Sequence, residues 1–181
     1  MKLFEIANPK PFVFVDMDGV LADFDQAIEK YDGFDKESRV NSLRKLGPRG
    51  VKDFFASMSP LPDGMKLIEW LNGHDIEWRI LSAPLRSDGV DPKDSRKASE
   101  IGKKDWLATH LGWEVAKKAI FEPNKWKWAN YGHQAAILID DTPKKIDAFN
   151  SAGGIGMLYT NLNSVLPKLK QIFHSNISKK D

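Results

Sequence analysis

Short apolar runs alternate with segments of helical periodicity along most of the chain. The first run, residues 12–15, is continuous and lies between prolines and the string DMDG, which is typical of a strand buried on both faces of a parallel sheet. Four further apolar runs follow at residues 78–81, 119–121, 136–139 and, more briefly, 157–159. The pattern therefore predicts five strands.

Segments with helical spacing separate these runs. They cover residues 65–71, 103–111, 125–131, 144–152 and 165–173. Strands that alternate with helices favour a parallel sheet with helices on both faces. We therefore predict an α/β fold of the Rossmann-like, three-layer α/β/α kind, with a mainly parallel five-stranded sheet.

Residues 23–60 interrupt this alternation. The segment holds polar, helix-like pieces and turn signals such as Asp32-Gly33, but no strand pattern. We interpret it as a small helical cap inserted after the first strand. The predicted organisation is thus an α/β core made of residues 1–22 and 61–181, with residues 23–60 as the cap.

Composition narrows the chemistry that this chain can perform. The 181 residues are 41% hydrophobic and 29% charged, a balance typical of a soluble globular domain. The absence of cysteine excludes disulfides, thiolate nucleophiles and cysteine-bound zinc. Neither a signal peptide nor a membrane span is recognisable, so a cytoplasmic location is expected. The net charge of +2 is too small to indicate nucleic-acid binding by itself.

Polar residues follow the predicted strands at the edge where parallel α/β sheets bind their ligands. The first strand is followed by two carboxylates, the second by a hydroxyl, the third by an acid and a lysine, and the fourth by two carboxylates: Asp16, Asp18, Ser82, Glu122, Lys125, Asp140 and Asp141. Clustered carboxylates repel one another unless a proton or a cation relieves them. Oxygen ligands of this kind suit Mg²⁺, although aspartates after strands also serve as turn residues or helix caps.

Four of these segments resemble the motifs of one enzyme family. Residues 16–24, DMDGVLADF, are similar to the first motif of the haloacid dehalogenase superfamily of phosphatases. Residues 80–84, 121–125 and 138–141 resemble its second, third and fourth motifs. Within the superfamily, the chain is most similar to the 5'(3')-deoxyribonucleotidase family.

The resemblance implies a role for each matched residue. Asp16 is then the nucleophile that forms an aspartyl-phosphate, and Asp18 is the general acid and base. Ser82 and Lys125 hold the phosphate, with Lys127 as the alternative lysine. The implied Mg²⁺ is bound by the Asp16 carboxylate, the Asp18 main-chain oxygen and Asp140, while Asp141 holds a metal-bound water. Phe24 matches a position that lines the nucleoside pocket.

The expected function is the magnesium-dependent hydrolysis of a small phosphomonoester, most simply a nucleoside monophosphate. The basic stretches 86–104 and 117–127 support an alternative, a 3'-phosphatase acting on DNA or RNA ends. A catalytically idle binding module with the same fold is the third hypothesis. No membrane partner is expected, and a homodimer is left open.

Overall fold

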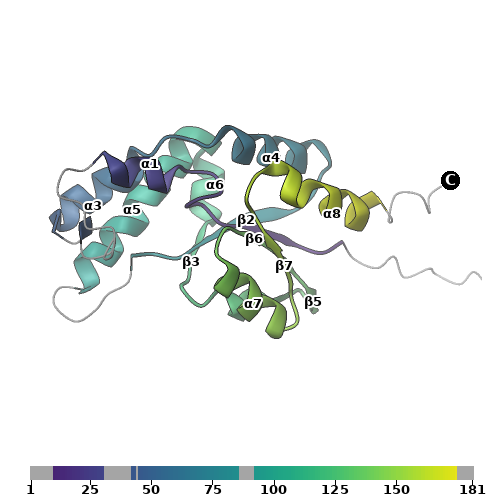
Figure 1. Cartoon of the computed structure of the whole chain (residues 1–181). Coiled ribbons are helices and arrows are strands. Elements are labelled where there is room, and N and C mark those ends of the chain that lie inside the picture. The colour runs from purple at the N-terminus through teal and green to yellow at the C-terminus, as the bar shows by residue number, and fades with distance from the viewer. Residues whose placement is uncertain (1–9, 31–41, 44, 86–91, 175–181) are drawn as a thin grey trace, which may run out of the picture.

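The computed structural model describes residues 10–30, 42–43, 45–85 and 92–174. Its centre is a five-stranded sheet in which all neighbours run parallel, in the order β3-β2-β1-β6-β7 (Figure 1). The strands are β1 (Val13–Val15), β2 (Trp78–Ser82), β3 (Ile120–Phe121), β6 (Ile137–Asp140) and β7 (Ile155–Leu158). The predicted α/β fold with a parallel five-stranded sheet is confirmed.

Helices lie on both sides of this sheet, which gives the predicted three layers (Figure 1). One side carries α4 (Pro62–Gly73), α5 (Pro92–Leu111), α6 (Trp113–Lys118) and α8 (Leu162–His174). The other side carries α7 (Pro143–Ser151), the 3-10 turn η1 (Lys125–Trp128) and the hairpin of β4 (Asn130–Tyr131) and β5 (Gln134–Ala135). None of the described helices is long and apolar enough to cross a membrane.

The continuous apolar run of β1 reflects burial on both faces of the sheet. Val13 and Val15 belong to the larger hydrophobic cluster, whereas Phe14 packs into the smaller one on the α7 side. All three side chains are fully buried. A central strand with two covered faces needs no polar alternation, and its first polar residues mark the point where the strand leaves the core.

The segment between β1 and α4 forms two described helices, α1 (Phe24–Glu29) and α3 (Gly47–Ala56). The turn signal at residues 32–33 lies outside the described residues, as do residues 31–41 as a whole and residue 44. Helix α3 packs against α5, and a Cβ at Gly102 would lie 2.3 Å from the Lys52 carbonyl oxygen. Glycine therefore permits this close approach. The division of the chain into a core and a cap stays a prediction.

The predicted helix over residues 125–131 is wrong. The chain forms the short η1 turn there and then enters the β4–β5 hairpin. The two loop residues, Gly132 and His133, have φ values of 62° and 66°. Two successive positive φ values define the turn that matches the twist of a tight hairpin, so the chain reverses where a helix would have continued.

Helix α5 is longer than the sequence pattern predicts. It begins at Pro92 rather than at residue 103, so residues 92–102 are helical, while residues 86–91 lie outside the described residues. In the part of the helix before residue 103, Ser95, Ala98 and Ser99 are buried. Because these buried side chains are small or carry a hydroxyl group, the sequence lacks the apolar repeat of about 3.6 residues that usually identifies a helix. Helix α6 was also missed.

Candidate active site

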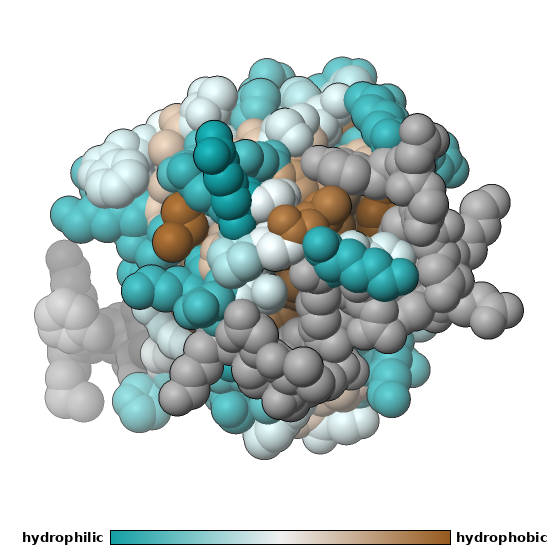
Figure 2. Space-filling model, turned by 90° about the vertical axis from the view of Figure 1, so that its left-hand side faces the viewer, coloured by the Kyte–Doolittle hydropathy of each residue, from teal (hydrophilic) through white to brown (hydrophobic). Residues whose placement is uncertain are grey.

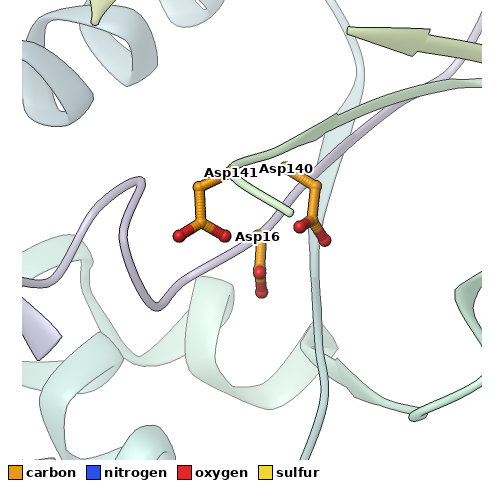
Figure 3. A group of neighbouring side chains, drawn as sticks. All are labelled: Asp16, Asp140 and Asp141. Atoms are coloured by element: carbon orange, nitrogen blue, oxygen red, sulfur yellow. The ribbon is translucent and has the colours of Figure 1, made fainter. Parts of the chain in front are cut away.

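Three carboxylates meet at the ends of two neighbouring strands. Asp16 follows β1, Asp140 ends β6, and Asp141 comes directly after it. The parallel register pairs Val15 with Ile139, which sets Asp16 beside Asp140. One oxygen from each of the three carboxylates lies within 4.8 Å of the others (Figure 3). The structure thus brings the predicted acidic residues together at one edge of the sheet.

Lys125 lies between the two buried carboxylates. Its Nζ is 2.7 Å from Asp16 Oδ1 and 2.5 Å from Asp140 Oδ2, and its side chain is fully buried. Lys127 points elsewhere, since its Nζ pairs with Glu122 Oε2 at 3.2 Å and its side chain is half exposed. Of the two lysines proposed from sequence, only Lys125 contacts the acidic cluster.

Lys103 joins the remaining predicted residues of the site. Its Nζ donates to Asp18 Oδ2 at 2.7 Å, to Ser82 Oγ at 2.9 Å and to the Ala83 carbonyl oxygen at 2.6 Å. Three contacts match the three N–H donors of an ammonium group. Lys103 and Ser82 are fully buried. Sequence reasoning singled out Asp18 and Ser82 but missed the lysine that connects them.

Lys145 is a second lysine that sequence reasoning missed. It projects from the first turn of α7, and its Nζ lies 3.5 Å from Asp16 Oδ2 and 3.7 Å from Asp140 Oδ2. Burial acts to lower the pKa of Lys145, but the charges of the neighbouring aspartates outweigh burial and raise it. Lys145 therefore stays a cation beside the acidic cluster.

The environment pushes the pKa values of the three clustered carboxylates apart. Burial opposes ionisation of Asp16, but the charges of Lys125, Lys145 and Lys103 outweigh it and hold the Asp16 pKa below its ordinary range. Burial, followed by the Asp16 charge, raises the pKa of Asp140. The same two causes, with the Asp140 charge, raise the pKa of Asp141 to about 6. Asp16 is thus the group held most firmly as a carboxylate.

The donor set at this edge fits a hard divalent cation. Asp16, Asp140 and Asp141 offer only oxygen atoms, and their mutual repulsion favours a cation among them. Gly19 has a φ of 73°, and a Cβ there would lie 2.1 Å from Asp141 Oδ2. Glycine thus leaves room for the Asp141 carboxylate against the loop that follows β1. Asp18 Oδ1 is buried and has no hydrogen-bond partner among the described residues.

A cavity of about 450 Å³ adjoins these residues, a size that suits a small organic ligand. Its charged lining is Asp18, Lys103, Lys125, Lys144 and Lys145, and its apolar lining includes Phe24, Phe55, Leu85, Pro123 and Trp126. Figure 2 shows the side of the molecule toward which the carboxyl ends of the strands point, with hydrophobic side chains near its centre among hydrophilic ones. The cavity combines a cationic region with apolar walls.

Phe24, which the sequence placed in a nucleoside pocket, lies in the wall of this cavity. Its ring packs against two further aromatic rings, with centroids 5.6 Å from Phe54 and 6.2 Å from Phe55. Phe55 also lines the cavity, whereas Phe54 is buried behind it. The 23–60 segment therefore contributes an aromatic wall next to the charged residues.

A usable signal for Lys103 existed in the sequence. Lys103 lies four residues after Ser99 and three before Trp106, a spacing that puts all three on one helical face. That face is buried, so a lysine on it needs polar partners. The signal requires the true start of α5 at Pro92, because a helix that begins at residue 103 has no preceding turn to define the face.

Comparison with known proteins supports these observations. No family model matches the chain. A protein of the Vibrio phage KVP40 named "Putative 5'(3')-deoxyribonucleotidase" is 30% identical over 138 residues, which are 75% of this chain and 68% of that protein. The chain therefore belongs to the 5'(3')-deoxyribonucleotidase family of the haloacid dehalogenase superfamily of phosphatases.

One solved structure supports the fold. A hydrolase from Pseudomonas syringae superposes with a TM-score of 0.53 at 14% identity, covering 91% of this chain and 99% of that one. A haloacid dehalogenase family hydrolase from Deinococcus radiodurans, determined with phosphate and sodium, covers 91% of this chain and 88% of its own with a TM-score of 0.46 and 14% identity. The superposition on the Pseudomonas syringae hydrolase supports the fold and nothing beyond it.

Proposed function

We propose that this protein hydrolyses nucleoside monophosphates in the presence of Mg²⁺, with Asp16 as the nucleophile. The observation that carries the proposal is the convergence of Asp16, Asp18, Ser82, Lys125 and Asp140 from four separate parts of the chain, next to a cavity that Asp18 and Lys125 line. The phage relative, with its printed deoxyribonucleotidase name, supports the choice of a nucleotide.

The charges of the site suit a phosphate dianion. Four carboxylates, on Asp16, Asp18, Asp140 and Asp141, face the three ammonium groups of Lys103, Lys125 and Lys145. With all of them ionised, the cluster lacks one positive charge. A bound divalent cation gives the cluster one net positive charge, and a phosphomonoester dianion together with the proton that Asp18 holds as general acid then brings the total to zero. The site therefore favours binding metal and substrate together.

Asp16 is suited to attack phosphorus. Its Oδ1 accepts hydrogen bonds from its neighbour Met17 N–H at 2.8 Å and from Lys125 Nζ at 2.7 Å, which fixes the carboxylate. The lysines keep it ionised. In the first step, an Asp16 oxygen bonds to phosphorus while the bond from phosphorus to the leaving alkoxide breaks. The product is an aspartyl-phosphate on Asp16.

Asp18 is suited to move the proton in both steps. It lines the cavity, and Lys103 fixes its Oδ2 while Oδ1 makes no hydrogen bond within the described part of the chain. Asp18 gives its proton to the leaving alkoxide in the first step. In the second step it takes a proton from the water that attacks phosphorus, the bond to Asp16 breaks, and phosphate leaves.

Lys125, Lys145 and the Ser82 hydroxyl would hold the phosphoryl oxygens as negative charge redistributes. The carboxylates of Asp16 and Asp140 and the Asp18 main-chain oxygen would bind the Mg²⁺, and Asp141 would hold a metal-bound water. The ion supplies positive charge against the phosphate when bound. The nucleoside would extend along the apolar wall that includes Phe24 and Phe55. The 23–60 segment would then act as the cap that shields the reaction from water.

A phosphate-release screen tests the proposal. The panel holds deoxynucleoside 5'- and 3'-monophosphates, ribonucleotides, sugar phosphates and oligonucleotides with a 3'-phosphate, each with Mg²⁺ and with a chelator. We expect release from mononucleotides that needs Mg²⁺ and disappears in Asp16→Asn. Preferential action on oligonucleotide ends would favour the nucleic-acid alternative. Wild-type protein that releases no phosphate from any substrate would favour the idle binding module.

A further inference from the structure

Trp126 is an exposed aromatic residue in the wall of the reactive cavity. Its side chain is 49% exposed, and it lines the cavity together with Lys125 and Lys145. Single exposed hydrophobic residues are ordinary on protein surfaces. Trp113 is such a case, because it is 66% exposed on α6 and does not line this cavity. The position of Trp126 beside the lysines is what distinguishes it.

The backbone on each side of Trp126 is held in place. Lys125 precedes it and is anchored to Asp16 and Asp140, while Trp128 follows it and packs edge-on against Phe14 at 5.6 Å between centroids. The Trp126 carbonyl accepts a hydrogen bond from Ala129 N–H at 3.1 Å. The backbone that carries the indole is therefore held next to the phosphate-binding lysine. Ordering the Trp126 side chain when a ligand binds then costs little conformational entropy.

The two aromatic walls of the cavity differ in their surroundings. The Phe24 ring already packs against Phe54 and Phe55. No ring in the described residues pairs with Trp126. A flat indole face with no aromatic neighbour, beside ammonium groups that attract an anion, suits a ligand that joins a phosphate to a planar ring.

We propose that Trp126 is a specificity-determining residue that stacks on the base of the nucleotide whose phosphate lies at Asp16. This inference rests on the proposed function and deepens it. Stacking of a base on an aromatic side chain contributes about 1–3 kcal/mol by alanine substitution. Removal of the indole then weakens nucleotide binding about 5- to 150-fold, because each 1.4 kcal/mol corresponds to a factor of ten.

The test compares Trp126→Ala, Trp126→Phe and the surface control Trp113→Ala. Each variant is assayed with Mg²⁺ on a deoxynucleoside monophosphate and on glycerol 2-phosphate, which has no ring. We expect Trp126→Ala to raise KM for the nucleotide about 5- to 150-fold while leaving kcat/KM for glycerol 2-phosphate near the wild-type value. Trp126→Phe recovers most of the loss, and Trp113→Ala matches wild type on both substrates.

Binding measured without turnover adds an independent readout. In an Asp16→Asn background, calorimetric affinity for the nucleotide falls with Trp126→Ala but affinity for inorganic phosphate does not. The inference is overturned if Trp126→Ala lowers kcat/KM equally for the nucleotide and for glycerol 2-phosphate, or if it leaves KM for the nucleotide unchanged. Wild-type protein that hydrolyses glycerol 2-phosphate but no nucleotide would instead show that the proposed function itself has failed.

Discussion

Lys103 Nζ donates to Asp18 Oδ2 at 2.7 Å and, from the same ammonium group, to Ser82 Oγ at 2.9 Å. One buried side chain on α5 thus connects the proposed general acid, after β1, with the proposed phosphate-binding hydroxyl, at the end of β2. The Lys103 ammonium also lies 4.9 Å from the ring centroid of Phe55 on α3. Helix α5 therefore links the 23–60 segment to the reacting groups.

Replacement of Lys103 by methionine keeps the length of the side chain but removes these donors. We expect kcat/KM to fall by about 10²–10³, since Asp18 and Ser82 lose their orientation. The free energy of unfolding should fall by about 1–3 kcal/mol, because the Ser82 hydroxyl and the Asp18 carboxylate lose their donor.

Lys104→Met is the matched control for this variant. Lys104 is the next residue on α5, is exposed, and has its Nζ 5.7 Å from the Phe121 ring centroid. Steady-state kinetics and urea unfolding should find it close to wild type. Equal kinetic losses in the two lysine variants would contradict a specific role for Lys103.

The two lysines of η1 give a second matched pair. Lys125→Ala removes the cation between Asp16 and Asp140, and we expect kcat to fall by about 10² or more. Lys127→Ala only breaks a partly exposed pair with Glu122, so its stability should change by about 0–1 kcal/mol and its turnover hardly at all. Phosphate-release assays on both variants show which of the two lysines binds the phosphate. Greater loss in Lys127→Ala would reverse the assignment.

Removal of the Lys125 charge should also shift the acid limb of the pH–rate profile. Lys125 holds the Asp16 pKa below its ordinary range, so its loss raises that pKa. The acid limb of kcat/KM in Lys125→Ala then moves toward higher pH, whereas in Lys127→Ala it stays in place. An unshifted limb in a still measurable Lys125→Ala variant would speak against ionised Asp16 as the reacting form.

The raised pKa of Asp141 leads us to expect an unusual pH dependence of stability in metal-free protein. Burial and the charges of Asp16 and Asp140 raise its pKa from 3.8 to about 6, so the folded protein holds this proton more tightly than the unfolded chain. Its contribution to stability is therefore present below 3.8 and is lost as the pH rises to about 6. Asp141→Asn removes this dependence.

Urea unfolding with a chelator, from pH 4 to pH 7, measures the difference between wild type and Asp141→Asn. We expect the free energy of unfolding of Asp141→Asn to rise relative to that of wild type as the pH rises. Added Mg²⁺ should reverse the order at pH 7, because it stabilises a site with ionised carboxylates. An asparagine variant whose stability does not rise relative to wild type with pH would contradict the raised pKa of Asp141. A variant that Mg²⁺ stabilises as much as it stabilises wild type would contradict the metal assignment.

The sequence predicted the sheet and the clustered acids for the same reason. Strands with two buried faces have continuous apolar sequences, so polar residues at their ends, such as Asp16 and Asp140, are easy to recognise. The hairpin after Trp128 was missed because its loop, Gly132 and His133, follows a segment of helical spacing. Local periodicity does not record where tertiary packing stops a helix.

Two of the three lysines of the site, Lys103 and Lys145, were missed for a different reason. Lys145 reaches Asp16 and Asp140 from α7, but in the sequence it is one of two adjacent lysines in a polar turn. Lys103 lies in a charged stretch that resembles a solvent-exposed helix face. Lysine is usually exposed, so a lysine in a charged stretch is assigned to the solvent-exposed face unless the start of its helix is known.

Capture of the covalent intermediate tests the central claim most directly. Protein mixed with a deoxynucleoside monophosphate and Mg²⁺ is quenched in acid during the first turnover, digested, and analysed by mass spectrometry. We predict one phosphoryl group on the peptide that carries Asp16, and none when Asp16→Asn is treated in the same way. An unmodified Asp16 peptide from protein that is actively releasing phosphate, or a phosphoryl group on another residue, would contradict this account.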